Sequence, residues 1–170
     1  MAACAEVRRR HALADVKLVL ITNATLFDRP KVRAALALLD ANQGEIWAKL
    51  DAGTSEYFAA IDRTQIPLGR ILRNLTEAAC ARPIVIQSLF MRVRGQPPGT
   101  EELDAYCRRL NAILAAGGRI KLVQIHTVAR RPAEEYVTPL DNAEVDALVS
   151  LVEQRTGLTA AGYYAPSPCK

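Results

Sequence analysis

The chain has 170 residues, of which 50% are hydrophobic and 24% charged, and its formal net charge at pH 7 is +4. This composition excludes a disordered chain and favours a single domain over residues 1–170 with its own apolar core. No apolar run approaches the ~20 residues of a transmembrane helix, and Arg8 to Arg10 do not precede an apolar segment as in a signal peptide. We therefore expect a cytoplasmic protein without a membrane partner.

Two kinds of segment alternate along the chain. Short runs rich in β-branched residues predict strands, and apolar residues at helical spacing predict helices. The predicted strands cover residues 17–22, 45–51, 83–91 and 119–127, and an extended segment at 161–165 would add a fifth. The predicted helices occupy residues 1–14, begin at Pro30, follow Thr54, begin at Pro67, begin at the N-cap Thr100, and run from about residue 141 to Gly157.

The spacing of the predicted strands indicates how they connect. Their midpoints are about 30 to 40 residues apart, which is the size of a βαβ unit. Right-handed crossovers then place the helices on one side of a curved, barrel-like sheet or on both sides of a doubly wound one. A complete eight-stranded barrel needs about 250 residues. We therefore predict an α/β fold with a parallel sheet of about four strands, covering helices and the form of a partial (β/α) barrel.

Polar residues stand at the carboxyl ends of all four strands, where ligands of parallel α/β folds gather. A period of two places the polar residues of the second strand on one face, and likewise those of the fourth. Each buried polar group without a partner costs about 1–3 kcal/mol, so these residues predict a polar cleft. The candidate binding residues are Thr22, Asn23, Lys49, Asp51, Gln87, Gln124 and His126.

Each candidate also has a purely structural interpretation. Thr22 and Asn23 suit a β-to-α turn, and Lys49 with Asp51 suits a structural ion pair. The two glutamines can hydrogen-bond to each other, and the histidine, without a metal partner at ligand spacing, can be a satisfied core residue. The arginine pair before Pro132 is more often a solvated loop than an anion clamp.

Recognised catalytic and metal motifs do not occur in the sequence. The P-loop, dinucleotide-binding, nucleophile-elbow and zinc-protease signatures are all missing. The four cysteines, Cys4, Cys80, Cys107 and Cys169, are too far apart in the chain for a zinc or disulfide framework, which predicts free, reduced thiols. We therefore assign no catalytic residue and no metal ligand.

Several segments together resemble the second half of a radical SAM domain, in particular the iron-sulfur oxidoreductases similar to the wyosine-tRNA enzymes. The resemblance covers roughly residues 10–156. The segments that carry it are Leu-Ile-Thr-Asn-Ala-Thr-Leu at 20–26, Lys-Leu-Asp-Ala-Gly at 49–53, Phe58, Ile-Asp-Arg at 61–63, Ile-Gln-Ser-Leu-Phe at 86–90, and 123–134.

The resemblance implies a cofactor and a role for the candidate residues. In that family a six-stranded partial barrel holds a 4Fe-4S cluster, which reduces S-adenosylmethionine to methionine and a 5′-deoxyadenosyl radical. The four strands here resemble the third to sixth strands of that barrel. Asp51 would contact the ribose of the cofactor with Lys49 beside it, Thr22 and Asn23 would lie next to the cofactor, and the polar residues of the last two strands would line the adenosyl or substrate side.

The sequence departs from the family where the cluster should bind. The C-x-x-x-C-x-x-C loop and the Gly-Gly-Glu-Pro segment are both missing, so a cluster is not expected on this chain alone. We expect a fragment or split member, inactive alone, whose missing strands come from an N-terminal half or a partner chain. Alternatives are a non-catalytic α/β binding or partner subunit and a small α/β module with an unrelated ligand. The substrate, a small molecule or RNA, stays open.

Overall fold

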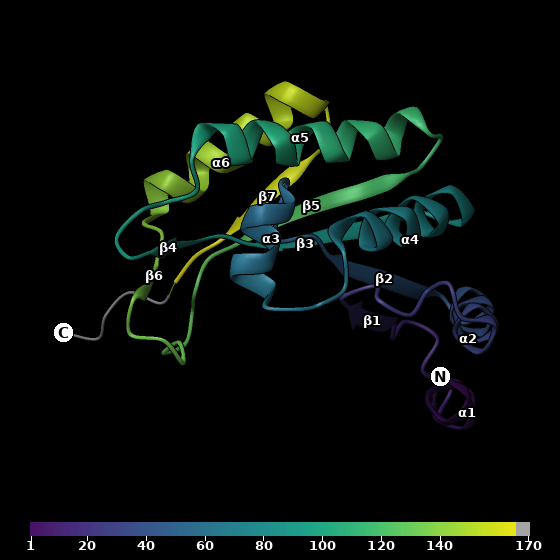
Figure 1. The fold of residues 1–170 in the computed structure, drawn as a ribbon. Coiled ribbons are helices and arrows are strands. Elements are labelled where there is room, and N and C mark those ends of the chain that lie inside the picture. The colour runs from purple at the N-terminus through teal and green to yellow at the C-terminus, as the bar shows by residue number, and fades with distance from the viewer. Residues whose placement is uncertain (166–170) are drawn as a thin grey trace.

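Five strands form one parallel sheet in the computed structural model, which describes residues 1–165 (Figure 1). All pairings within this sheet are parallel, and the sheet is not closed into a barrel. The predicted α/β fold is therefore confirmed, and the segment near residue 161 supplies the fifth strand. In spatial order the strands are β1 (Leu18–Thr22), β2 (Gly44–Lys49), β3 (Ile84–Leu89), β5 (Ile120–His126) and β7 (Ala160–Tyr163).

Helices cover one face of the sheet, and α4, α5 and α6 can be followed on that side in Figure 1. The core lies between these helices and the sheet. Leu75 of α4, Leu110 of α5 and Ile86 of β3 are all fully buried there. The opposite face, here called the open face, leaves Ile21 58% exposed. The helices are α1 (Ala2–Arg10), α2 (Pro30–Asp40), α3 (Ser55–Asp62), α4 (Leu68–Ala81), α5 (Thr100–Ala115) and α6 (Asn142–Thr156).

Local sequence signals set several of the helix ends. Pro30 occupies the first turn of α2, where its missing N–H costs nothing. The Thr54 side chain accepts a hydrogen bond from the first turn of α3. Asp141 and Glu144 form a capping box at the start of α6, and Gly157 ends that helix with φ at 70°. These ends follow from residue chemistry alone, which is why they were predictable.

Two predicted helix boundaries are wrong. The N-cap of α5 is Gly99, and Thr100 is instead its first helical residue without a side-chain cap bond. The N-terminal helix ends at Arg10, before the predicted residue 14. Beyond it the chain folds back, because the Arg8 guanidinium donates to the carbonyls of Ala14 at 2.6 Å and Val16 at 2.7 Å.

The predicted strand at 83–91 is in fact two strands. β3 ends at Leu89, and β4 (Met91–Val93) pairs antiparallel with β6 (Val137–Pro139), which lies between β5 and α6. Between them, Phe90 is completely buried, and its ring meets that of Tyr106 edge-on with centroids 5.2 Å apart. Leu89, Phe90 and Met91 are all apolar, so the hydrophobic pattern gave no sign of this break.

The edge of the sheet at β1 has no neighbouring strand among residues 1–165. Val19 and Ile21, on the open face of this edge strand, are 40% and 58% exposed. An apolar edge is thus exposed, and edges of this kind favour pairing with another chain. No helix in the described part of the chain is long and apolar enough to cross a membrane.

Candidate functional site

The register of the sheet aligns the candidate polar residues across the open face. Lys49 of β2 lies opposite Gln87 of β3, which lies opposite Gln124 of β5. His126 follows two residues later and lies opposite Tyr163 of β7. Residues two apart share a face of a strand, so all of these side chains belong to the open face. We call Lys49, Gln87, Gln124 and His126 the polar row.

Hydrogen bonds connect the members of the polar row. The Gln87 amide nitrogen donates to Gln124 Oε1 at 3.0 Å and lies 3.3 Å from His126 Nε2. Gln124 is 2% exposed, and its amide nitrogen lies 3.4 Å from the Tyr163 hydroxyl. The two glutamines therefore do bond to each other, as their structural interpretation predicted. Of the four amide atoms, only Gln87 Oε1 has no hydrogen-bond partner within residues 1–165, so it is the one that the open face offers to a ligand.

His126 is a neutral imidazole in this setting. Its ring stacks on Tyr163, with centroids 4.3 Å apart and planes 11° from parallel. Burial lowers the pKa of His126 below its ordinary value of 6.5, and the positive charge of Lys49 lowers it further. A neutral ring at pH 7 both donates and accepts hydrogen bonds. Tyr163, which no sequence pattern singled out, thus fixes the plane of the imidazole.

Lys49 and Asp51 form the ion pair that their structural interpretation predicted. Lys49 Nζ lies 3.2 Å from Asp51 Oδ2, and Asp51 Oδ1 accepts the Leu89 N–H at 2.7 Å. Asp51 is only 4% exposed. Burial raises the pKa of this carboxyl, while Lys49 and the Leu89 N–H act in the opposite direction. Both oxygens of Asp51 are therefore already engaged within the protein.

Asp62, the last residue of α3, is a further carboxyl, close enough to Asp51 for their charges to interact. Its Oδ2 atom is buried and has no hydrogen-bond partner within residues 1–165. Burial raises the pKa of Asp62 to about 6, and the negative charge of Asp51 adds to the rise. The sequence carried one signal for this residue: a carboxylate at a helix C-terminus opposes the helix dipole and needs an explanation.

A cavity of about 140 Å³ brings these carboxyls together with the loop after β1. Asn23, Lys49, Asp51, Asp62 and Thr64 are among the residues that line it. With Thr25, which also lines it, the cavity thus offers one ammonium, two carboxyls, an amide and two hydroxyls. Such a set binds a small group that carries several hydroxyls or an amine. Thr22 is not among the lining residues.

Thr22 and Asn23 form a turn at the end of β1, as their structural interpretation predicted. Thr22 Oγ1 accepts the Ala24 N–H at 3.1 Å, and Thr22 lies opposite Ala48, on the helix-covered side. Asn23 Oδ1 accepts from the hydroxyl of Thr25 at 2.9 Å. Of the pair, Asn23 alone reaches the cavity.

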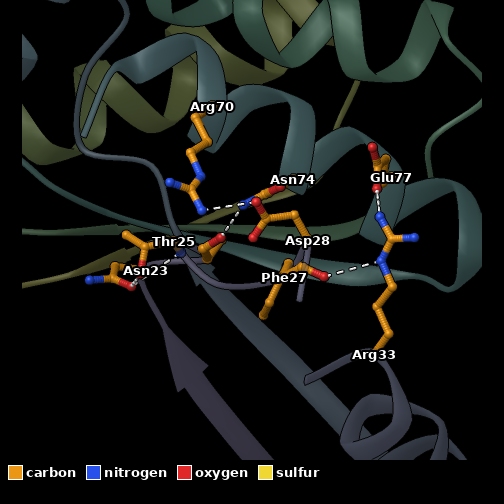
Figure 2. Close-up of polar contacts among 9 residues, drawn as sticks. Asn23, Thr25, Phe27, Asp28, Arg33, Arg70, Asn74 and Glu77 are labelled. Carbon is orange, nitrogen blue, oxygen red and sulfur yellow. Dashed lines mark hydrogen bonds and ion pairs between the residues drawn. The ribbon is translucent and has the colours of Figure 1, made fainter. Parts of the chain in front are cut away.

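Helix α4 holds the loop after β1 in place (Figure 2). The buried Asn74 amide donates to the Ala24 carbonyl at 2.7 Å. Arg70 pairs with Asp28 of this loop at 2.9 Å. Arg33, at the start of α2, pairs with Glu77 of α4 at 2.6 Å and donates to the Phe27 carbonyl at 3.4 Å. Several independent contacts thus fix the wall that Asn23 contributes.

Helix α5 fixes the loop after β2, which follows Asp51. The buried Glu102 carboxylate accepts hydrogen bonds from the N–H groups of Gly53 and Thr54. The Gly53 backbone passes so close to α5 that an added Cβ would lie 2.0 Å from the Tyr106 nitrogen. Only glycine allows this approach, so the position of Asp51 depends on both Gly53 and Glu102.

The thiols do not fit an iron-sulfur cluster. Cys4 lies on α1, Cys80 on α4 and the buried Cys107 on α5, and all are free. Among residues 1–165, no three His, Cys, Asp or Glu side chains are grouped so that they could hold a metal ion. Cys169 lies outside the described residues. A cluster needs several thiolates converging on one point, and separate helices anchor these thiols.

Comparison with known proteins gives no relative: the chain matches no protein-family model and no curated protein sequence. The radical SAM resemblance therefore depends on the residues quoted above. The open face itself presents a neutral imidazole, two amides and a lysine on parallel strands, and the carboxyls of Asp51 and Asp62 lie beside them in the adjoining cavity.

Proposed function

We propose that this chain is a radical SAM-like half-barrel whose polar row and adjoining cavity bind the adenosyl part of S-adenosylmethionine. One observation carries the proposal: Lys49, Gln87 and Gln124 stand in register across three parallel strands, at the edge of the sheet where such folds bind ligands. Gln87 Oε1, which has no partner within residues 1–165, offers an acceptor of the kind that recognises the amino group of a purine, and Gln124 holds Gln87 in place. The neutral His126 extends this surface toward Tyr163.

The cavity suits the ribose hydroxyls rather than the whole nucleoside. Its volume of about 140 Å³ is below the ~300 Å³ of a site that encloses a complete small molecule. The resemblance implies that Asp51 contacts the ribose, but both oxygens of Asp51 already have partners. Asp62 Oδ2 has none in the described chain. We therefore assign the principal contact with a ribose hydroxyl to Asp62, with Asp51 and Lys49 supporting it.

Cleavage of the cofactor requires a reduced cluster, and the residues of this chain do not fit one. The proposal is therefore binding without catalysis by this chain alone. Within residues 1–165, the chain's own groups bind and orient: Gln87 Oε1 accepts from the base, Asp62 accepts from a hydroxyl, and Lys49 neutralises Asp51.

Isothermal titration of the purified chain with S-adenosylmethionine, adenosine and methionine tests this. We expect the first two to bind and methionine not to bind. Asp62→Asn and Gln87→Leu should each weaken binding roughly tenfold, which corresponds to the loss of one hydrogen bond to the ligand. The matched controls Asp15→Asn and Gln154→Leu alter exposed residues away from the site and should change nothing.

Two results would overturn the proposal. One is the absence of saturable binding of adenosine and S-adenosylmethionine at millimolar concentration. The other is binding that the site variants and their controls affect equally. Anaerobic reconstitution with iron and sulfide tests the catalytic half separately: we expect no stoichiometric 4Fe-4S absorption and no 5′-deoxyadenosine.

A non-catalytic partner subunit is a second candidate function, favoured by the open edge at β1. Val19 and Ile21 expose apolar surface beside unpaired backbone groups. Under this proposal the edge pairs with a strand of another chain, whether or not the polar row binds a nucleoside. Light scattering of the purified chain over a range of concentrations distinguishes a monomer from an edge-paired assembly.

A further inference from the structure

A second cavity, of about 560 Å³, lies apart from the polar row, between the end of α3 and the β4–β6 ribbon. Its volume falls within the ~300–1,000 Å³ range of small-molecule sites. The ends of β3 and β5 form its floor, at the same edge of the sheet as the polar row. The proposed nucleoside site does not use it.

The walls of this cavity are mostly apolar. Ile61 of α3, Leu89 of β3, Met91 and Val93 of β4, and Val128 after β5 all line it. These side chains come from four different segments, so the cavity is a product of the tertiary structure. An apolar lining of this kind gains free energy by covering a hydrocarbon or aromatic surface.

Arginines are the cationic residues that line the cavity. Arg63 is already engaged, because its guanidinium pairs with Glu134 at 2.8 Å and bonds the Tyr136 hydroxyl. Arg130 and Arg131, in the loop after β5, make no ion pair or side-chain hydrogen bond with residues 1–165. Glu134 is the only acid among the described lining residues, and Arg63 neutralises it. The lining therefore has a net positive charge of two.

We propose that this cavity binds a small amphipathic anion: an apolar acyl or aryl body with one carboxylate or phosphate group. The apolar body covers the walls formed by α3, β3 and β4. The anionic group pairs with Arg130 and Arg131, since a guanidinium binds either anion through paired hydrogen bonds. A neutral ligand would leave both charges unused, and a cation would be repelled.

Isothermal titration with four probes that share a decyl chain tests the proposal: decanoate, decyl phosphate, decanol and decyltrimethylammonium, each below its micelle concentration. We expect saturable binding of one molecule of decanoate or decyl phosphate per chain, with the neutral and cationic probes at least roughly tenfold weaker. The comparison of decanoate with decyl phosphate identifies the preferred anion.

Variants of the charged and apolar parts complete the test. Arg130→Gln with Arg131→Gln should weaken decanoate binding roughly tenfold. The matched control, Arg73→Gln with Arg108→Gln, removes two exposed arginines from α4 and α5 and should leave binding unchanged. Ala60→Trp, at an exposed position of α3 that lines the cavity, should weaken binding with all arginines intact.

Three outcomes would overturn the proposal. If decanol bound as tightly as decanoate, the anionic group would contribute nothing to binding. If the Arg130/Arg131 variant and its control bound decanoate with equal affinity, these arginines would not be the residues that bind the anion. Attachment to vesicles containing anionic phospholipid, without saturable binding of monomeric decanoate or decyl phosphate, would instead indicate a membrane surface. Each result is independent of S-adenosylmethionine binding, which the same variants should leave unchanged.

Discussion

Replacing Asp62 by Asn should stabilise the protein at neutral pH and not at pH 4. The pKa of Asp62 rises from its ordinary 3.8 to about 6 on folding, because burial and the charge of Asp51 oppose ionisation. Between these values the folded state keeps a proton that the unfolded state has lost. Stability should therefore fall as pH rises from about 4 to about 6, and the lost stability does not return above that range.

The size of the effect follows from the shift in pKa. At 1.36 kcal/mol per pH unit, the full shift of Asp62 corresponds to about 3 kcal/mol. The carboxyl is only half-buried, so screening by solvent reduces this to about 1–2 kcal/mol. The difference in unfolding free energy between Asp62→Asn and the unmodified protein should grow by this amount between pH 4 and pH 7.

Urea unfolding at pH 4, 5, 6 and 7 measures this difference, with Asp15→Asn as the matched control. The raised pKa of Asp51 acts in the same direction, and its main cause, burial, is common to all three proteins and cancels in the comparison. The charge interaction between Asp51 and Asp62, which Asp62→Asn removes, is part of the measured difference. A difference between Asp62→Asn and the unmodified protein that stays constant over this range would refute the reasoning. So would a variant that loses stability relative to the unmodified protein as pH rises.

Three further substitutions test the supports of the site and the sheet edge. Asn74→Ala leaves the Ala24 carbonyl without its buried donor and should cost about 1–3 kcal/mol in urea unfolding; an unchanged midpoint would contradict this. Gly53→Ala places a methyl group against the Tyr106 backbone and should cost about 3 kcal/mol, and a variant as stable as the unmodified protein would show that α5 can move. Ile21→Lys should reduce concentration-dependent self-association in light scattering; a protein that is already monomeric would argue against edge pairing at β1.

The positions of the strands were predictable because buried parallel strands are short, nearly continuous apolar runs. Helix ends were predictable where a capping residue marks them, as at Asp141 and Gly157. The break within the predicted strand at 83–91 was not predictable, because Leu89, Phe90 and Met91, which span it, are all apolar. What separates them is the packing of Phe90 against Tyr106, a residue of a later helix.

The sequence also indicated which polar residues belong to the site, but only in part. A period of two placed Gln124 with His126 on one face, and their strand ends pointed to the ligand-binding edge. The role of Asp62 and the stacking of Tyr163 required the register and the path of α3. The arginine pair before Pro132 looked like a solvated loop, and only the fold places an apolar cavity beside it.

By itself, then, the sequence determined the order of the elements, the parallel class of the sheet and the polar ends of its strands. These depend on periodicity and capping, which act between residues close in the chain. The tertiary structure alone decided that Lys49, Gln87 and Gln124 lie in one row. It also decided that Asp62 lies close enough to Asp51 for their charges to interact. Such contacts join segments tens of residues apart, and their geometry depends on how the whole core packs rather than on any local pattern.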